Sequence, residues 1–172
     1  EKTGHNLKEL EKRLVVIDRA QQTITGLSQQ MVSLQDILSN KQSRGAFGEI
    51  QLQDIVTAAL PPSAFEFQST LSNGKRSDCL LKLPNPPGSI VVDSKFPLES
   101  FQALREARDE TARAQASRAF AADVGTHVKA IAEKYIVPGE TADSALMFLP
   151  SEAVYAELHA TFRNVVEDSF RR

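Results

Sequence analysis

The segment that decides the fold consists of two strand-like runs joined by a proline-rich turn. Residues 76–83 read Arg-Ser-Asp-Cys-Leu-Leu-Lys-Leu, residues 84–87 read Pro-Asn-Pro-Pro, and residues 89–95 read Ser-Ile-Val-Val-Asp-Ser-Lys. The two outer runs are short, apolar in the middle and bounded by turn residues, which is the pattern of β-strands. The sequence therefore predicts a β-hairpin over residues 76–95.

The predicted hairpin brings two aspartates together. With a four-residue loop, Leu83 pairs with Gly88, and the numbers of paired residues sum to 171. This register places Asp78 directly opposite Asp93, and side chains paired in this way have Cβ atoms about 4.5–5.5 Å apart. Lys95 follows Asp93 by two positions. It shares the same face, because side chains alternate along a strand.

Two carboxylates that face each other repel, unless a cation lies between them. Mg²⁺ (or Mn²⁺) accepts a few carboxylate oxygens, retained waters and a backbone carbonyl such as that of Ser94. A divalent ion held by Asp78 and Asp93 lowers the pKa of a bound water and polarises a phosphoryl oxygen. Lys95 is then placed to orient the attacking hydroxide or to offset charge in the transition state. Glu49, on the preceding helix, is a candidate third carboxylate. This set predicts hydrolysis of a phosphodiester.

A plain strand end is the alternative interpretation, with Lys95 paired to Asp93 or Glu99 and no chemistry. The other reactive side chains indicate no second site. The three histidines lack metal-ligand spacing, Cys79 is expected in the core, and Ser151 is expected to cap a helix. No Gly-rich phosphate loop is present, so no small-molecule cofactor is expected.

The segments around the hairpin alternate between helical and strand patterns. A helix is expected from Arg44 to about Leu60, with Ser43 as its N-cap. Its expected apolar face consists of Phe47, Ile50, Leu52, Ile55, Val56 and Ala59. The remaining expected elements are a strand over 64–70, a turn at 72–74, a long helix over 98–135, a fully buried strand over 144–149 and a helix starting at 151. This order predicts an α/β fold with a mixed sheet flanked by helices.

Residues 1–40 are predicted to be a separate helical arm, with the globular domain over residues 41–172. Apolar residues recur there in alternating steps of three and four, which is the heptad pattern of a coiled coil. They are Leu7, Leu10, Leu14, Ile17, Ile24, Met31 and Leu38. We expect the arm to make a homo-oligomer; the alternative is a helix that packs back on the core.

Composition and charge exclude several classes of protein. Apolar residues make up 41% and charged residues 24% of the chain, with one cysteine. These values are typical of a globular domain and exclude a disulfide-rich fold. A net charge of −2 gives no overall attraction to nucleic acid, so binding to DNA requires a local basic patch. Arg44, Lys75 and Arg76 flank the predicted acidic site and are candidate phosphate contacts.

Four blocks of the sequence resemble the RmuC family, which comprises bacterial proteins assigned to DNA recombination. They are Arg-Gly-Ala-Phe-Gly-Glu-Ile-Gln-Leu at 44–52, Arg-Ser-Asp at 76–78, Val-Val-Asp-Ser-Lys-Phe-Pro-Leu at 91–98 and Met-Phe-Leu-Pro-Ser-Glu at 147–152. The resemblance covers roughly residue 40 to the end. It implies a restriction-endonuclease-like domain of the PD-(D/E)XK type.

The resemblance also implies roles for individual residues. Asp78 matches the first acid of the nuclease motif, Asp93 and Lys95 match its second acid and lysine, and Glu49 matches the helix carboxylate. Ser77 departs from the family's usual Arg-Pro-Asp but leaves Asp78 in place. The family carries a membrane segment and a coiled coil before this domain and continues beyond it. We therefore expect this sequence to be part of a longer cytoplasmic protein, with any membrane anchor outside it.

Two functions are compatible with these observations. The first is a Mg²⁺-dependent DNA endonuclease domain that acts in recombination or repair. The second is an inactive nuclease-fold module that binds DNA or acts as a scaffold, dimerised by its arm. A structural coiled-coil protein unrelated to nucleases ranks third, because it leaves the facing aspartates unexplained.

Overall fold

The computed structural model describes residue 17, residues 19–22 and residues 40–171. The chain divides into two units, Glu1–Arg44 and Gly45–Arg172, and the fold given below is that of the second. The predicted arm over residues 1–40 lies almost entirely outside the described residues. Within it, residues 19–22 are helical. The coiled coil therefore stays a prediction.

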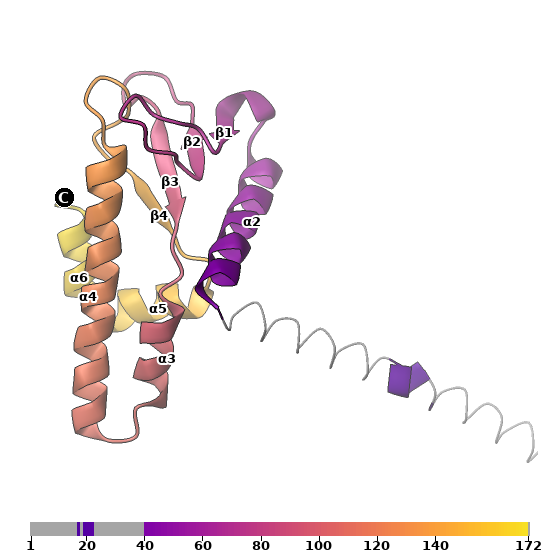
Figure 1. Ribbon diagram of the computed structural model, residues 1–172, viewed down its shortest axis with the longest axis vertical. Coiled ribbons are helices and arrows are strands. Elements are labelled where there is room, and N and C mark those ends of the chain that lie inside the picture. The colour runs from indigo at the N-terminus through magenta and orange to yellow at the C-terminus, as the bar shows by residue number, and fades with distance from the viewer. Residues whose placement is uncertain (1–16, 18, 23–39, 172) are drawn as a thin grey trace, which may run out of the picture. The chain divides into compact units, whose positions relative to one another are not determined.

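The described domain is a mixed α/β fold, as the sequence predicts (Figure 1). It begins with a helix, continues through three strands and a helical hairpin, and ends with a fourth strand and two short helices. The elements are α2 (Lys41–Ala59), η1 (Pro62–Ala64), β1 (Phe65–Phe67), β2 (Cys79–Leu81), β3 (Ile90–Ser94), α3 (Leu98–Glu106), α4 (Glu110–Tyr135), β4 (Leu146–Phe148), α5 (Glu152–Thr161) and α6 (Arg163–Ser169).

The four strands form one sheet in the order β1-β2-β3-β4. The first three are antiparallel neighbours, whereas β4 lies parallel to β3. In the β2–β3 pair, Cys79 faces Val92 and Leu81 faces Ile90. The numbers of paired residues sum to 171, which confirms the predicted register. One further step along this register brings Asp78 opposite Asp93.

The two faces of the sheet are covered by different helices, α2 on one side and α4 on the other (Figure 1). Because side chains alternate along β3, Val92 points toward α2 and packs with Leu52 and Val56, whereas Val91 points toward α4 and packs with Ile131. Burial of both faces explains why β3 is apolar in consecutive positions.

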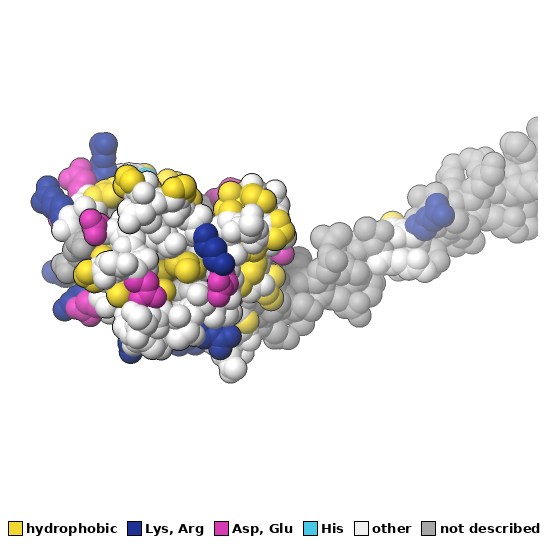
Figure 2. Space-filling model, turned by 90° about the horizontal axis from the view of Figure 1, so that it is seen from above, with side chains coloured by type: hydrophobic (Ala, Val, Ile, Leu, Met, Phe, Trp, Pro, Cys, Tyr) yellow, Lys and Arg dark blue, Asp and Glu magenta, His cyan; other side chains and the backbone are white. Residues whose placement is uncertain are grey.

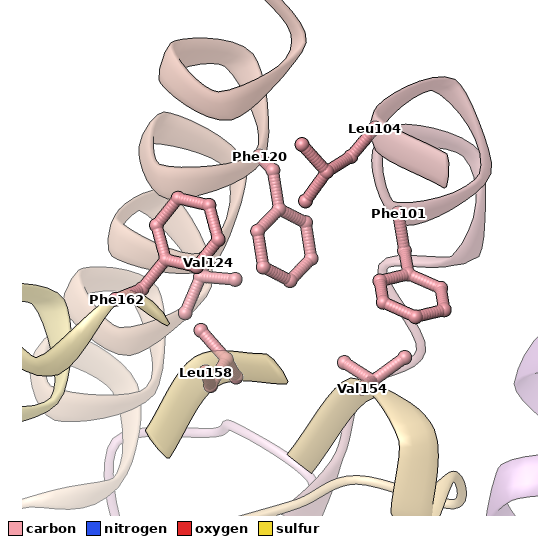
Figure 3. Close-up of a cluster of buried hydrophobic side chains, with 7 residues drawn as sticks. All are labelled: Phe101, Leu104, Phe120, Val124, Val154, Leu158 and Phe162. Atoms are coloured by element: carbon pink, nitrogen blue, oxygen red, sulfur yellow. The ribbon is translucent and has the colours of Figure 1, made fainter. Parts of the chain in front are cut away.

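A third cluster of apolar side chains lies among the helices (Figure 3). Phe120 and Val154 are both fully buried in it. Phe101 of α3 packs on Phe120 of α4, with ring centroids 5.9 Å apart. The predicted single helix over 98–135 is therefore wrong, because 19 residues of continuous helix would separate these rings by about 28 Å. The break falls before Asp109, whose Oδ1 accepts the Ala112 N–H at 2.8 Å as an N-cap.

The start of α2 also differs from the sequence-based prediction. The helix begins at Lys41, and Asn40 rather than Ser43 acts as the cap: Asn40 Oδ1 accepts the Ser43 N–H at 2.7 Å. On its predicted apolar face, Ile50 and Ile55 are 56% and 52% exposed. The buried face is narrower than predicted, since Leu52 and Val56 are the members of the predicted set that are buried.

The C-terminal part needs two further corrections. The run at residues 144–149 forms β4 at the edge of the sheet, and Leu146 is 48% exposed, so this strand is not fully buried. The helix that follows Ser151 is interrupted at Phe162, which separates α5 from α6. Phe162 is buried against Phe120, which accounts for the change of direction there.

Within the part of the chain that the structure describes, no helix is both long and apolar enough to cross a bilayer.

Candidate functional site

At the end of β3, the buried carboxylate of Asp93 pairs with the ammonium group of Lys95. Asp93 is only 3% exposed and lies on the α4 face of the sheet, as its alternation with the buried Val91 requires. The Lys95 Nζ donates to Asp93 Oδ2 and, at 3.3 Å, to the Ser94 carbonyl oxygen. Of the two partners predicted for Lys95 at a plain strand end, the structure shows the pairing with Asp93.

Asp78 lies immediately before β2, beside the same end of β3. Its Oδ2 accepts the Ser94 N–H at 2.7 Å, which ties its carboxylate to the residue after Asp93. Burial raises the pKa of Asp78, and the negative charges of Asp93 and Glu49 raise it further. The Ser94 N–H and the Lys95 charge act in the opposite direction without reversing the shift. The facing aspartates predicted from the register thus interact electrostatically.

Glu49 is brought toward this site by the close approach of α2 to β3. The neighbouring Gly48 permits that approach, because a methyl group there would collide with Ser94 Oγ and lie 3.3 Å from Pro150 Cγ. Glu49 is half-buried. Its Oε2 accepts a hydrogen bond from Gln68 Nε2 at 3.2 Å.

Gln68 is a site residue that sequence reasoning missed. It follows β1 with a φ of 54°, in the left-handed region that side chains other than glycine rarely adopt. Its backbone N–H donates to the Asp78 carbonyl oxygen at 3.0 Å while its side chain binds Glu49. Gln68 therefore joins α2 to the strand that carries Asp78. Nothing in the local sequence signals this, since a glutamine after a strand is ordinarily a surface residue.

Tyr135 at the end of α4 is a second residue that the sequence reasoning missed. It is buried, and its hydroxyl donates to the Arg76 carbonyl oxygen at 3.0 Å. Burial raises its pKa, and the negative charge of Asp93 raises the pKa further. Its spacing of four from Ile131, on the inward face of α4, was the available signal.

The carboxylates at this site can be compared with the ligands that a divalent cation requires. The charges of Glu49, Asp93 and Lys95 all act on Asp78, so three carboxylates and one ammonium group lie near one another. The described residues nevertheless contain no group of three acidic, histidine or cysteine side chains placed to hold a metal ion, so Glu49 does not complete a three-ligand site. Mg²⁺ commonly uses one or two carboxylates and keeps several waters. Asp78 and Asp93 fit such a water-rich site.

The predicted phosphate contacts fall into two environments. Lys75 and Arg76 are exposed on the segment that leads into Asp78. The Lys75 N–H donates to Asn73 Oδ1 at 3.0 Å, and the Arg76 carbonyl oxygen accepts from the Tyr135 hydroxyl. Arg44 is only 7% exposed. Lys75 and Arg76 are therefore the members of this set that are accessible to DNA.

Two structural predictions near the site are confirmed. Cys79 is fully buried in the core, and burial followed by the charge of Asp78 raises its pKa to about 11, so the thiol is protonated at neutral pH. Ser151 caps α5, with its hydroxyl accepting the Val154 N–H at 3.3 Å.

Comparison with known proteins places the chain in a family. A model of the RmuC family matches residues 1–172. A protein of Xylella fastidiosa named DNA recombination protein RmuC homolog is 30% identical over 172 aligned positions, which cover 88% of this chain and 36% of that protein. The homolog of that name from Pseudomonas aeruginosa is 27% identical over 163 positions, covering 90% and 36%.

The chain thus spans about a third of the length of these curated relatives. No solved structure matches it. The family match over the whole chain confirms the resemblance carried by the four sequence blocks, and the chain belongs to the RmuC family.

Proposed function

We propose that this chain is the nuclease-like part of a DNA recombination protein and that it hydrolyses DNA phosphodiesters with Mg²⁺ or Mn²⁺. The observation that carries the proposal is the arrangement at the ends of β2 and β3. Asp78 and Asp93 lie opposite each other there, and Lys95 is held on Asp93. The name of the curated relatives, DNA recombination protein, supports DNA as the substrate.

In this proposal Asp78 and Asp93 hold the metal ion. A bound divalent ion would supply an activated water and would polarise the phosphoryl oxygen. Lys95, whose side chain is 28% exposed, can reach a phosphate and offset the charge that develops on it. Glu49, held by Gln68, adds negative charge beside Asp78 and is suited to orient a water.

DNA would be held by Lys75 and Arg76, which are exposed next to Asp78. The described part of the surface in Figure 2 carries basic and acidic side chains interspersed, without a broad basic patch. Because the net charge of the chain is −2, a few phosphate contacts near the site are expected to provide the affinity. We also propose that the arm over residues 1–40 makes the protein a homo-oligomer, which raises the local concentration of DNA-binding sites.

A second candidate function is an inactive nuclease-fold module that binds DNA or serves as a scaffold. The pairing of Lys95 with Asp93 favours it, because an ion pair of this kind stabilises a strand end without any reaction. This candidate predicts that the protein retains DNA equally well with EDTA and with Mg²⁺. It also predicts that replacing Lys75 and Arg76 by alanine abolishes that retention.

The two functions are separated by a cleavage assay on plasmid and linear DNA with Mg²⁺, Mn²⁺ or EDTA. The nuclease proposal predicts metal-dependent cutting that Asp93→Asn and Lys95→Ala both abolish while circular dichroism shows that they remain folded. Glu66→Gln is the matched control, since Glu66 is an exposed carboxylate that pairs with Lys82 on the strands. Cutting that persists in Asp93→Asn contradicts the proposal. Absence of cutting together with metal-independent DNA retention supports the inactive module.

A further inference from the structure

The Lys95 ammonium group touches two oxygen atoms that a metal ion would be expected to use. It donates to Asp93 Oδ2 and to the Ser94 carbonyl oxygen. The sequence points to the Asp93 carboxylate and a backbone carbonyl such as that of Ser94 as oxygens for Mg²⁺. A metal ion that binds through these two oxygens therefore competes with the ammonium group for them.

The burial of Asp93 favours a cation beside its carboxylate. With only 3% of the residue exposed, an unpaired carboxylate at this position would lose most of its hydration. Lys95 compensates that charge from a position that is 28% exposed, so its side chain has room to leave toward solvent. The Lys95 side chain thus neutralises Asp93 and has room to move away from it.

We propose that Lys95 is an internal competitor of the metal ion, paired with Asp93 in the absence of metal and displaced when a divalent cation binds. Displacement leaves the ammonium group without its carboxylate and makes it available to a DNA phosphate. Metal binding and the readiness of Lys95 for catalysis are thereby coupled. This inference rests on the proposed function, because it takes Asp78 and Asp93 as the metal site.

The first test is calorimetric titration of Mn²⁺ into the wild-type protein and Lys95→Met. Methionine keeps most of the side-chain length and removes the competing charge. We expect Mn²⁺ to bind Lys95→Met about fivefold more tightly than the wild type, the scale that a partly exposed ion pair supplies. Lys82→Met is the matched control, because Lys82 pairs with Glu66 away from Asp93. It should leave Mn²⁺ affinity unchanged.

The second test uses the unmodified protein and so does not depend on how a variant folds. Acetic anhydride is applied with and without saturating Mn²⁺, and acetylation of each lysine is measured by mass spectrometry. We expect Lys95 to be protected without metal and to react several-fold faster with Mn²⁺, while Lys82 reacts at the same rate in both. Unchanged reactivity of Lys95 at saturating Mn²⁺ overturns the displacement.

The outcomes separate this inference from the function on which it rests. Mn²⁺ that binds the wild type and binds Lys95→Met equally or more weakly overturns the competition and leaves the metal site intact. No Mn²⁺ binding to any of the proteins overturns the metal site, and the competition with it. Tighter binding by Lys95→Met, with faster acetylation of wild-type Lys95, supports both.

Discussion

Different interactions stabilise the helical cluster around Phe120 and the acidic end of β2 and β3, which carries Asp78 and Asp93. In the helical cluster, shown in Figure 3, apolar side chains from α3, α4 and α5 pack against one another, and their burial determines their positions. At the acidic end, each carboxylate is placed by a specific partner: Lys95 for Asp93, the Ser94 N–H for Asp78, and Gln68 for Glu49. Substitutions in the helical cluster should therefore lower the free energy of unfolding. Substitutions at the acidic end should mainly weaken metal binding.

The largest effect on stability is expected from Phe120→Ala. Phe120 is fully buried and contacts the rings of Phe101 and Phe162. Its truncation should lower the free energy of unfolding by about 3–5 kcal/mol, because it removes apolar burial and leaves a cavity. Urea denaturation followed by circular dichroism measures this. A loss below about 1 kcal/mol would show that the cluster is not the main apolar core.

Gly48→Ala should have the next largest effect on stability, and it should also disturb the acidic end. The added methyl group meets Ser94 Oγ and forces α2 away from β3, at a cost of about 1–3 kcal/mol. It should also weaken Mn²⁺ binding, since Ser94 holds Asp78. Gly45→Ala is the control in the same helix, where nothing lies within 4 Å of an added Cβ. It should raise stability by up to about 1 kcal/mol. Equal stability of the two variants would refute the close approach.

Gln68 offers a way to separate stability from site geometry. Gln68→Ala and Gln68→Gly both remove the hydrogen bond to Glu49, but only glycine accepts a φ of 54° without strain. The glycine variant should be more stable than the alanine variant by about 1 kcal/mol. Both should show the same reduced Mn²⁺ affinity in calorimetry. If Mn²⁺ affinity instead follows stability, Gln68 acts through the fold rather than on Glu49.

The smallest effect expected is a pH dependence of stability from Asp78. Its pKa is raised in the folded state above the ordinary value of 3.8, so the folded protein holds that proton more tightly than the unfolded chain. Its contribution to stability is therefore lost as the pH rises from 3.8 through the raised pKa. Asp78→Asn keeps an acceptor for the Ser94 N–H and lacks this titration.

The stability of Asp78→Asn relative to the wild type should consequently increase over that pH range. Urea denaturation at a series of pH values measures the difference between the two proteins, in which the carboxylates that do not interact with Asp78 cancel. A constant difference between the two proteins would show that Asp78 titrates normally.

The comparison of the two regions also explains what the sequence could predict. The register of the hairpin follows from a turn length and a pairing rule, so the sequence alone predicts Asp78 opposite Asp93. The break at Asp109 was missed because residues 98–135 keep a helical pattern throughout, and only the contact between Phe101 and Phe120 requires a turn.

Within the site, local pattern and tertiary contact contributed differently. Glu49 was identified by its place in a helix next to the strands. Gln68 and Tyr135 were not, because their roles depend on a left-handed backbone and on the position where α4 ends. The burial of Arg44 was likewise invisible, since a basic residue in the first turns of a helix is ordinarily exposed.

The most direct test of a metal site at Asp78 and Asp93 is a calorimetric titration of Mn²⁺ into the wild-type protein and into Asp93→Asn. The account predicts saturable binding to the wild type and its loss in Asp93→Asn, with both proteins folded by circular dichroism. Equal binding by the two proteins, or no binding by the wild type, would contradict a metal site formed by Asp78 and Asp93.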